Sequence, residues 1–158
     1  MNQSPATQLL AILPTERAEL TSFITLLERE QKMLVENSTD LLLDLSKQKT
    51  VAAISLQELA DTRSTTLQNL IPQLTAAAIN SWLLEHCPAD STMYSEILTL
   101  AKRAHQLNRT NGELIQMKLR HNQQALAVLN NAANKANLYG SDGQPSLSPN
   151  GGRSLGSG

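Results

Sequence analysis

The sequence predicts an all-α protein: an antiparallel, coiled-coil-like bundle of long helices with one extended C-terminal helix and a disordered tail. Long stretches without glycine or proline are rich in Leu, Ala, Gln and Glu, which favour helix. Six of the seven glycines lie at or after Gly140, so Gly112 is the only one in the body of the chain. The sequence contains no sustained alternation of β-branched and aromatic residues, so no strand is predicted. We therefore expect a helical domain over residues 1–138 and a flexible tail over residues 139–158.

Composition limits the partners that the chain can have. Its 158 residues suit one ordinary domain, and the net charge of −1 gives no global attraction to nucleic acid or to a membrane. The part before Asp90 carries a net charge of −4 and the rest +3, which we interpret as solvated faces that attract each other weakly. The alternative is a basic surface on the last helix, but aromatic residues for stacking on the bases of nucleic acid are few. The apolar runs are too short to span a bilayer, and the single Cys87 fits a reducing compartment. We expect a cytoplasmic protein with no nucleic-acid partner and no direct membrane insertion.

The first helix is expected over about residues 15–36, with Pro14 just before it and Thr15 as its N-cap. Residues 5–13 either extend this helix with a kink or form a separate turn. The apolar residues of one face are Leu20, Phe23, Ile24, Leu27 and Leu34. A break follows at residues 37–40, where Ser38 or Thr39 is expected to cap the next helix and Asp40 to lie in its first turn.

The second helix is expected over about residues 40–70. Its apolar stripe is Leu41, Leu45, Ala52, Leu56, Leu59, Leu67 and Leu70. Arg63 falls within this stripe, and we expect it to extend its charge to solvent rather than to form a buried ion pair. A short helix is expected over residues 74–86, followed by a loop at 88–92 in which Ser91 or Thr92 caps the last helix.

The last helix is expected over about residues 93–137. Its stripe is Ile97, Leu100, Ala104, Leu107, Asn111, Leu114, Ile115, Leu119, Asn122, Leu126, Leu129 and Ala133. In an up–down–up bundle this helix extends past the turn between the first two by roughly 20 Å. Residues 123–137 then have no intramolecular partner, which indicates a binding surface. Self-association through the same stripe, or folding back onto the bundle, remains the alternative.

The asparagines of this helix form a separate signal. Asn108, Asn111 and Asn122 lie on or beside the apolar stripe. A buried asparagine weakens a helix–helix seam but fixes its register. The alternative is that they are ordinary surface residues.

The arrangements needed for catalysis are missing. No glutamate is followed three residues later by histidine, and the body of the chain offers no Gly-rich phosphate loop. His86 and Cys87 are adjacent, so on a helix they point in different directions and make a poor nucleophile pair. We expect no enzymatic activity, no metal and no cofactor.

An ordered series of short motifs in the last third carries a resemblance to a known family. The residues are Leu107-Asn108, Asn111-Gly112, Leu114, Asn122-Gln123-Gln124-Ala125-Leu126, Leu129, Leu138-Tyr139-Gly140 and Asp142-Gly143-Gln144. This series resembles the FlgN family of flagellar export chaperones, with weaker matches in the earlier helices. The resemblance implies an all-helical cytoplasmic protein that binds the hook-associated proteins of the hook–filament junction before export. It also implies delivery to the membrane-embedded flagellar type III export gate and its associated export ATPase apparatus, with Tyr139 as the docking residue.

The expected client-binding surface lies on the last helix. Its residues are Leu119, Asn122, Leu126, Val128 and Leu129, with Ile115 and Met117 at the edge. The rival hypothesis is a structural coiled-coil adaptor that forms a homodimer through this helix. A weak homo-oligomer is compatible with either hypothesis.

Overall fold

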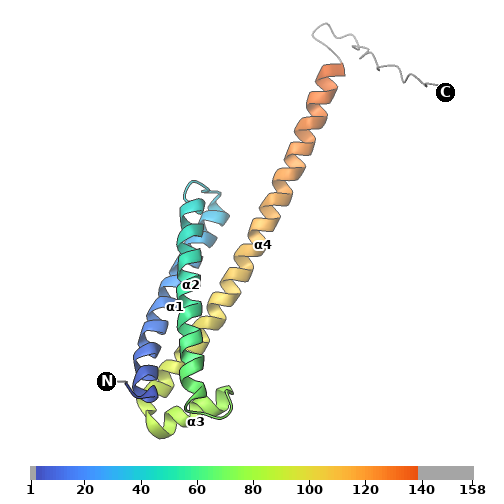
Figure 1. Cartoon of the computed structure of the whole chain (residues 1–158). Coiled ribbons are helices and arrows are strands. Elements are labelled where there is room, and N and C mark those ends of the chain that lie inside the picture. Colours follow the sequence, from blue (N-terminus) through green and yellow to red (C-terminus); the bar gives the residue numbers. More distant parts are fainter. Residues whose placement is uncertain (1–2, 139–158) are drawn as a thin grey trace, which may run out of the picture. The chain divides into compact units, whose positions relative to one another are not determined.

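The computed structural model describes residues 3–138, which form four α-helices and no strand (Figure 1). The helices are α1 (Pro5–Glu36), α2 (Leu42–Gln68), α3 (Ala76–His86) and α4 (Pro88–Leu138). The all-α prediction is thus confirmed. The chain divides into two units, Met1–Ile115 and Gln116–Gly158. The domain boundary predicted between residues 138 and 139 falls at the end of the described residues and stays a prediction.

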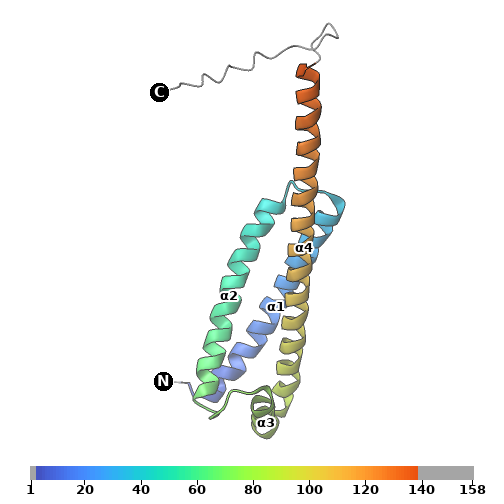
Figure 2. The same cartoon turned by 90° about the vertical axis from the view of Figure 1, so that its right-hand side faces the viewer.

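Three long helical segments run side by side in the first unit (Figure 2). The ion pairs between them are Glu16–Arg63 and Glu30–Lys49 from α1 to α2, and Arg17–Glu96 and Glu28–Arg103 from α1 to α4. In the first two pairs the residue number rises along α1 while it falls along α2, so α1 and α2 form an antiparallel hairpin. In the last two pairs the residue number rises along both helices, so this part of α4 is parallel to α1.

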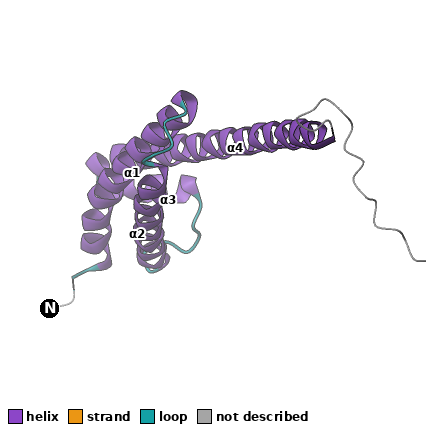
Figure 3. Cartoon of the chain, turned by 90° about the horizontal axis from the view of Figure 1, so that it is seen from above, coloured by secondary structure: helices purple, strands orange, loops and turns teal. Residues whose placement is uncertain are grey.

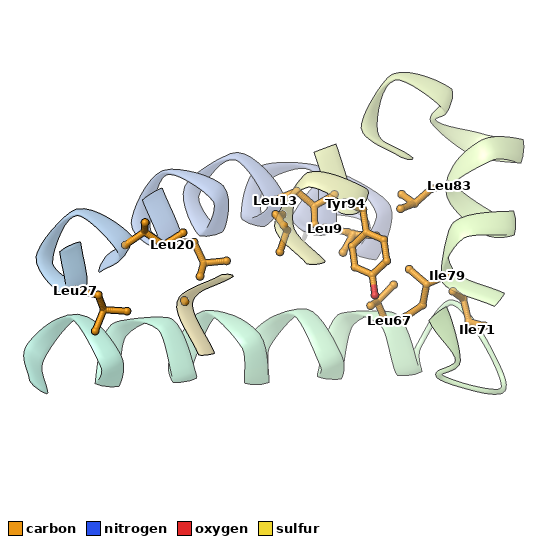
Figure 4. Close-up of a cluster of buried hydrophobic side chains, with 12 residues drawn as sticks. Leu9, Leu13, Leu20, Leu27, Leu67, Ile71, Ile79, Leu83 and Tyr94 are labelled. Carbon is orange, nitrogen blue, oxygen red and sulfur yellow. The ribbon is translucent and has the colours of Figure 1, made fainter. Parts of the chain in front are cut away.

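The core of the first unit is aliphatic apart from one buried tyrosine. Leu9 and Leu13 of α1 meet Leu67 of α2, Leu83 of α3 and Tyr94 of α4 at the end of the hairpin where the chain begins (Figure 4). The short α3 closes this end, and the loops of the described residues lie before α1 and between the helices (Figure 3). Leu, Ile and Ala therefore supply most of the buried side chains, as the composition predicts.

Of the two alternatives for residues 5–13, the structure shows the extension of the first helix, which begins at Pro5. Ser4 is its N-cap, and its Oγ accepts a hydrogen bond from the Thr7 N–H at 3.2 Å. Pro5 occupies the first turn, where a missing N–H costs nothing. The helix then continues through Pro14, so the prediction of Thr15 as N-cap is wrong: the Thr15 hydroxyl instead donates to the Ala11 carbonyl at 3.4 Å.

The connection between α1 and α2 uses backbone geometry in place of the predicted side-chain cap. Asn37 ends α1 in the left-handed conformation, with φ 57° and ψ 26°, which asparagine tolerates better than most residues. The N-cap of α2 is Leu41, which makes no side-chain cap hydrogen bond. Ser38 and Thr39 are therefore not its caps, and the acidic residue of its first turn is Asp44 rather than Asp40. Leu41 is also exposed and does not belong to the buried stripe.

The start of α4 also differs from the prediction. The helix begins at Pro88, so residues 88–92 are helical rather than a loop. Ser91 is buried within the first turn, and its hydroxyl donates to the Pro88 carbonyl at 3.0 Å. Neither Ser91 nor Thr92 is an N-cap. Proline is well suited to a first helical turn, so Pro88 is the feature of the sequence that marks this start.

Candidate partner-binding surface on the last helix

A polar layer ties α1, α2 and α4 together in the middle of the first unit. Asn111 is fully buried, and its Nδ2 donates to the Leu27 carbonyl at 2.9 Å and to Glu30 Oε1 at 2.8 Å. Lys49 Nζ donates to the same carboxylate at 3.1 and 3.4 Å. Burial of an asparagine in the seam is thus confirmed at this position, and its hydrogen bonds favour one alignment of α4 on α1. Its role in fixing the register stays a prediction. Asn108, by contrast, is exposed.

A second polar layer lies nearer the end that α3 closes. Arg63 Nη1 donates to Glu16 Oε1, and the two side chains retain 18% and 5% of their exposure. The Arg63 guanidinium carbon also lies 5.9 Å from the centroid of the Tyr94 ring. Burial raises the pKa of the Tyr94 hydroxyl above its ordinary value, while the Arg63 charge lowers it and the Glu16 charge raises it. The expectation that Arg63 extends to solvent is therefore wrong.

The sequence contains a signal for these two layers in the spacing of their charged residues. Glu16 and Glu30 are 14 residues apart, and so are Lys49 and Arg63. Fourteen residues are two heptads, so equal spacing on two antiparallel helices brings each acid opposite a base. Charged residues that fall inside an apolar stripe at matching intervals thus predict buried pairs.

In the second unit, α4 carries apolar side chains that are exposed to solvent. From Leu119 to Leu138 every residue is exposed. Leu119, Asn122, Leu126 and Leu129 follow one another at intervals of three, four and three residues, the spacing of a coiled-coil seam. We call these four residues the exposed seam. The leucines among them retain 55 to 64% of their exposure, whereas a leucine in a folded core is normally covered. Ile115, the last residue of the first unit, retains 38%.

Two of the predicted client-binding residues lie on another face of the helix. Met117 and Val128 are exposed, at 59% and 67%. At 100° per residue they point roughly 150° away from the exposed seam, since 11 residues make about three turns. One partner helix cannot cover both faces at once. The predicted surface therefore divides into the exposed seam and a separate pair of apolar residues.

Two features of the described residues bear on metal binding and catalysis. No group of three or more His, Cys, Asp or Glu side chains is placed to hold a metal ion in this part of the chain. The groove between α3 and the start of α4 is lined by Asn80, Leu84, Ser91, Thr92, Ser95, Glu96, Thr99 and Leu100. Its one carboxylate, on Glu96, is already paired with Arg17 at 2.9 Å. Within the described residues, no helix is both long and apolar enough to cross a membrane.

A family model described as FlgN protein matches residues 1–146. The chain belongs to the FlgN family. Two curated relatives, each called flagella synthesis protein FlgN, come from Yersinia enterocolitica and from its serotype O:8, biotype 1B strain. Each is 33% identical over 126 residues, which cover 78% of this chain and 80% of the relative. No solved structure matches the chain.

The FlgN match includes both regions singled out in the sequence. The exposed seam lies within the matched residues, and so does Tyr139. Tyr139 itself lies outside the described residues, so its predicted docking role stays a prediction. For this FlgN-family chain, the exposed seam of α4 is therefore the candidate partner-binding surface.

Proposed function

We propose that the chain is a cytoplasmic type III export chaperone without enzymatic activity. It binds hook-associated proteins of the hook–filament junction and delivers them to the flagellar export gate and its ATPase apparatus. Membership of the FlgN family and the name of the relatives, flagella synthesis protein, support the flagellar part of this proposal. The observation that carries the binding part is the exposed seam, whose three leucines retain more than half of their exposure.

An amphipathic client helix fits this surface physically. It can lay its apolar face on the exposed seam, as helices do in groove-type recognition. Covering a leucine contributes roughly 1.5–3 kcal/mol before the cost of ordering the client. Three leucines therefore support an affinity that holds a client and still releases it.

The decisive experiment removes two seam leucines. The double variant Leu126→Ala, Leu129→Ala is titrated with the terminal segment of a hook-associated protein by calorimetry. We expect the Kd to rise at least about a hundredfold, because about 3 kcal/mol of binding free energy from the burial of these side chains is lost. Circular dichroism should show unchanged helicity, since both side chains are exposed and alanine favours helix.

The opposite face supplies a matched control. In the double variant Met117→Ala, Val128→Ala, two residues of similar exposure on the same helix are truncated. We expect client affinity to stay within about twofold of the parent, because these side chains point away from the seam. Equal losses in both double variants would show that the client does not use the exposed seam.

Delivery to the gate is tested separately. The variant Tyr139→Ala should bind the client like the parent but bind the export gate more weakly, because the tail is a second, tethered contact. Pull-down by the cytoplasmic part of the gate measures this. Equal retention of both proteins would refute the docking role of Tyr139.

The adaptor hypothesis stands as the second candidate because the seam has coiled-coil spacing. In that function the exposed seam is covered by a second copy of the chain and needs no client. The presence or absence of a client-dependent complex distinguishes the two.

A further inference from the structure

The exposed seam is bordered by uncharged side chains along most of its length. On one side, at seven-residue intervals, stand Gln116, Gln123, Asn130 and Asn137. On the other side stand Lys118, Ala125 and Ala132. Between Leu114 and Leu138 the sequence has no aspartate or glutamate and three basic residues, of which only Lys118 borders the seam. Paired helices usually select each other through opposite charges at these bordering positions. Beyond Lys118, a partner of this seam therefore meets no charge at the bordering positions by which it could be selected.

Asn122 is the one polar residue within the seam, and Asn111 shows how this helix uses such a side chain. When Asn111 is covered by α1, its amide nitrogen finds two acceptors, the Leu27 carbonyl and the Glu30 carboxylate. Asn122 is exposed. A partner that covered it with apolar groups alone would leave the amide without hydrogen bonds, which is costly in a buried interface.

We propose that Asn122 selects the client and fixes its register on α4. The client helix is one with uncharged bordering positions and a single acceptor side chain, Gln, Asn or Glu, opposite Asn122. The leucines on either side supply affinity for any apolar face. Asn122 then disfavours every alignment in which its amide packs against a methyl group, because the amide would lack a hydrogen-bond partner. This inference rests on the proposed function, because it takes the occupant of the seam to be the client.

Disulfide cross-linking measures the register of the client helix on α4. Cys87→Ser removes the single native cysteine, and Gln123→Cys places a new one beside the seam. The probe is the terminal segment of a hook-associated protein, prepared with one cysteine at each successive position. With Asn122 present, we expect cross-links at one client position and its neighbours a turn away. In the Asn122→Leu variant, we expect cross-links at several positions a heptad apart, with affinity equal to or tighter than that of the parent.

Two further variants separate register from general effects on the helix. Asn122→Gln keeps the amide, so a single register should be retained. Asn131→Leu makes the same change on the opposite face, where it should leave the cross-linking pattern unaltered. A single unchanged register in Asn122→Leu would overturn the proposal.

Salt dependence tests the uncharged borders. We expect client affinity to change less than about threefold between about 0.05 and 0.5 M NaCl, because few charges face the client. A fall of about tenfold or more would show that charge selects the client after all.

Failure of this inference and failure of the proposed function give different results. If the Leu126→Ala, Leu129→Ala variant binds the client like the parent, the proposed site itself is wrong. If that variant loses the client while Asn122→Leu keeps one register, only the role of Asn122 is wrong. A stable dimer of the chain that excludes the client would overturn both.

Discussion

Glu16 and Arg63 show what a buried charge contributes to this fold. Both side chains are largely covered, and each neutralises the other between α1 and α2. Removing one member leaves a buried charge without its counter-ion, which costs more than the pair itself contributes. The loss of stability on removing one member therefore does not measure what the intact pair contributes.

A double-mutant cycle checks this. We expect Glu16→Leu or Arg63→Met alone to lower the free energy of unfolding by about 3 kcal/mol, and the double variant to recover most of that loss. Urea denaturation measures each free energy. The exposed pair of Arg17 and Glu96 is the control, where Glu96→Gln should cost less than about 1 kcal/mol. Additive losses in the cycle would contradict the coupling.

Tyr94 gives a prediction at alkaline pH. Its pKa is raised above 10.0, chiefly by burial, so the folded state holds the phenolic proton more tightly than the unfolded state. The resulting stability is present below pH 10 and is lost as pH rises through the folded-state pKa. Absorbance titration should show one late-titrating tyrosine that disappears in Tyr94→Phe, and that variant should lose less stability above pH 10. If every tyrosine of the parent protein titrates near pH 10, the predicted rise in the pKa of Tyr94 is wrong.

At the scale of elements, Gly112 is a weak point in α4. It is exposed within the helix, and a Cβ added there would meet nothing within 4 Å. Glycine in a helix interior costs roughly 0.5–1 kcal/mol relative to alanine because it loses more backbone entropy on folding. No contact in the first unit requires glycine at this position.

We therefore expect Gly112→Ala to stabilise the protein by roughly 0.5–1 kcal/mol and to raise Tm by about 1–4 °C. Calorimetric melting measures the shift. Ala101→Gly, at another exposed position of α4, should lower Tm by a similar amount. A lower Tm for Gly112→Ala would mean that the helix needs the freedom of glycine there.

At the scale of the whole molecule, the question is whether the exposed seam pairs with a second copy. Its four residues cover less than two heptads, short of the three to four that sustain a coiled coil, and Asn122 weakens it further. We expect light scattering to give the mass of one chain, 17.2 kDa, and a heavier defined complex once client is added. Twice the chain mass, unchanged by the client, would favour the adaptor hypothesis.

The sequence by itself determined the helical class, the order of the helices and the apolar faces of α1 and α4, because helical periodicity is local information. It also carried the family motifs and the candidate surface on α4, including Asn111 and Asn122. Tertiary structure decided which of those asparagines is buried, since only the approach of α1 covers Asn111 and gives its amide two acceptors. It likewise decided that Arg63 is paired and that α1 continues through Pro14. Spacing along one helix does not contain either fact, because local preferences are overridden by tertiary context. The pairing of Arg63 appears only when the charges of α1 and α2 are compared.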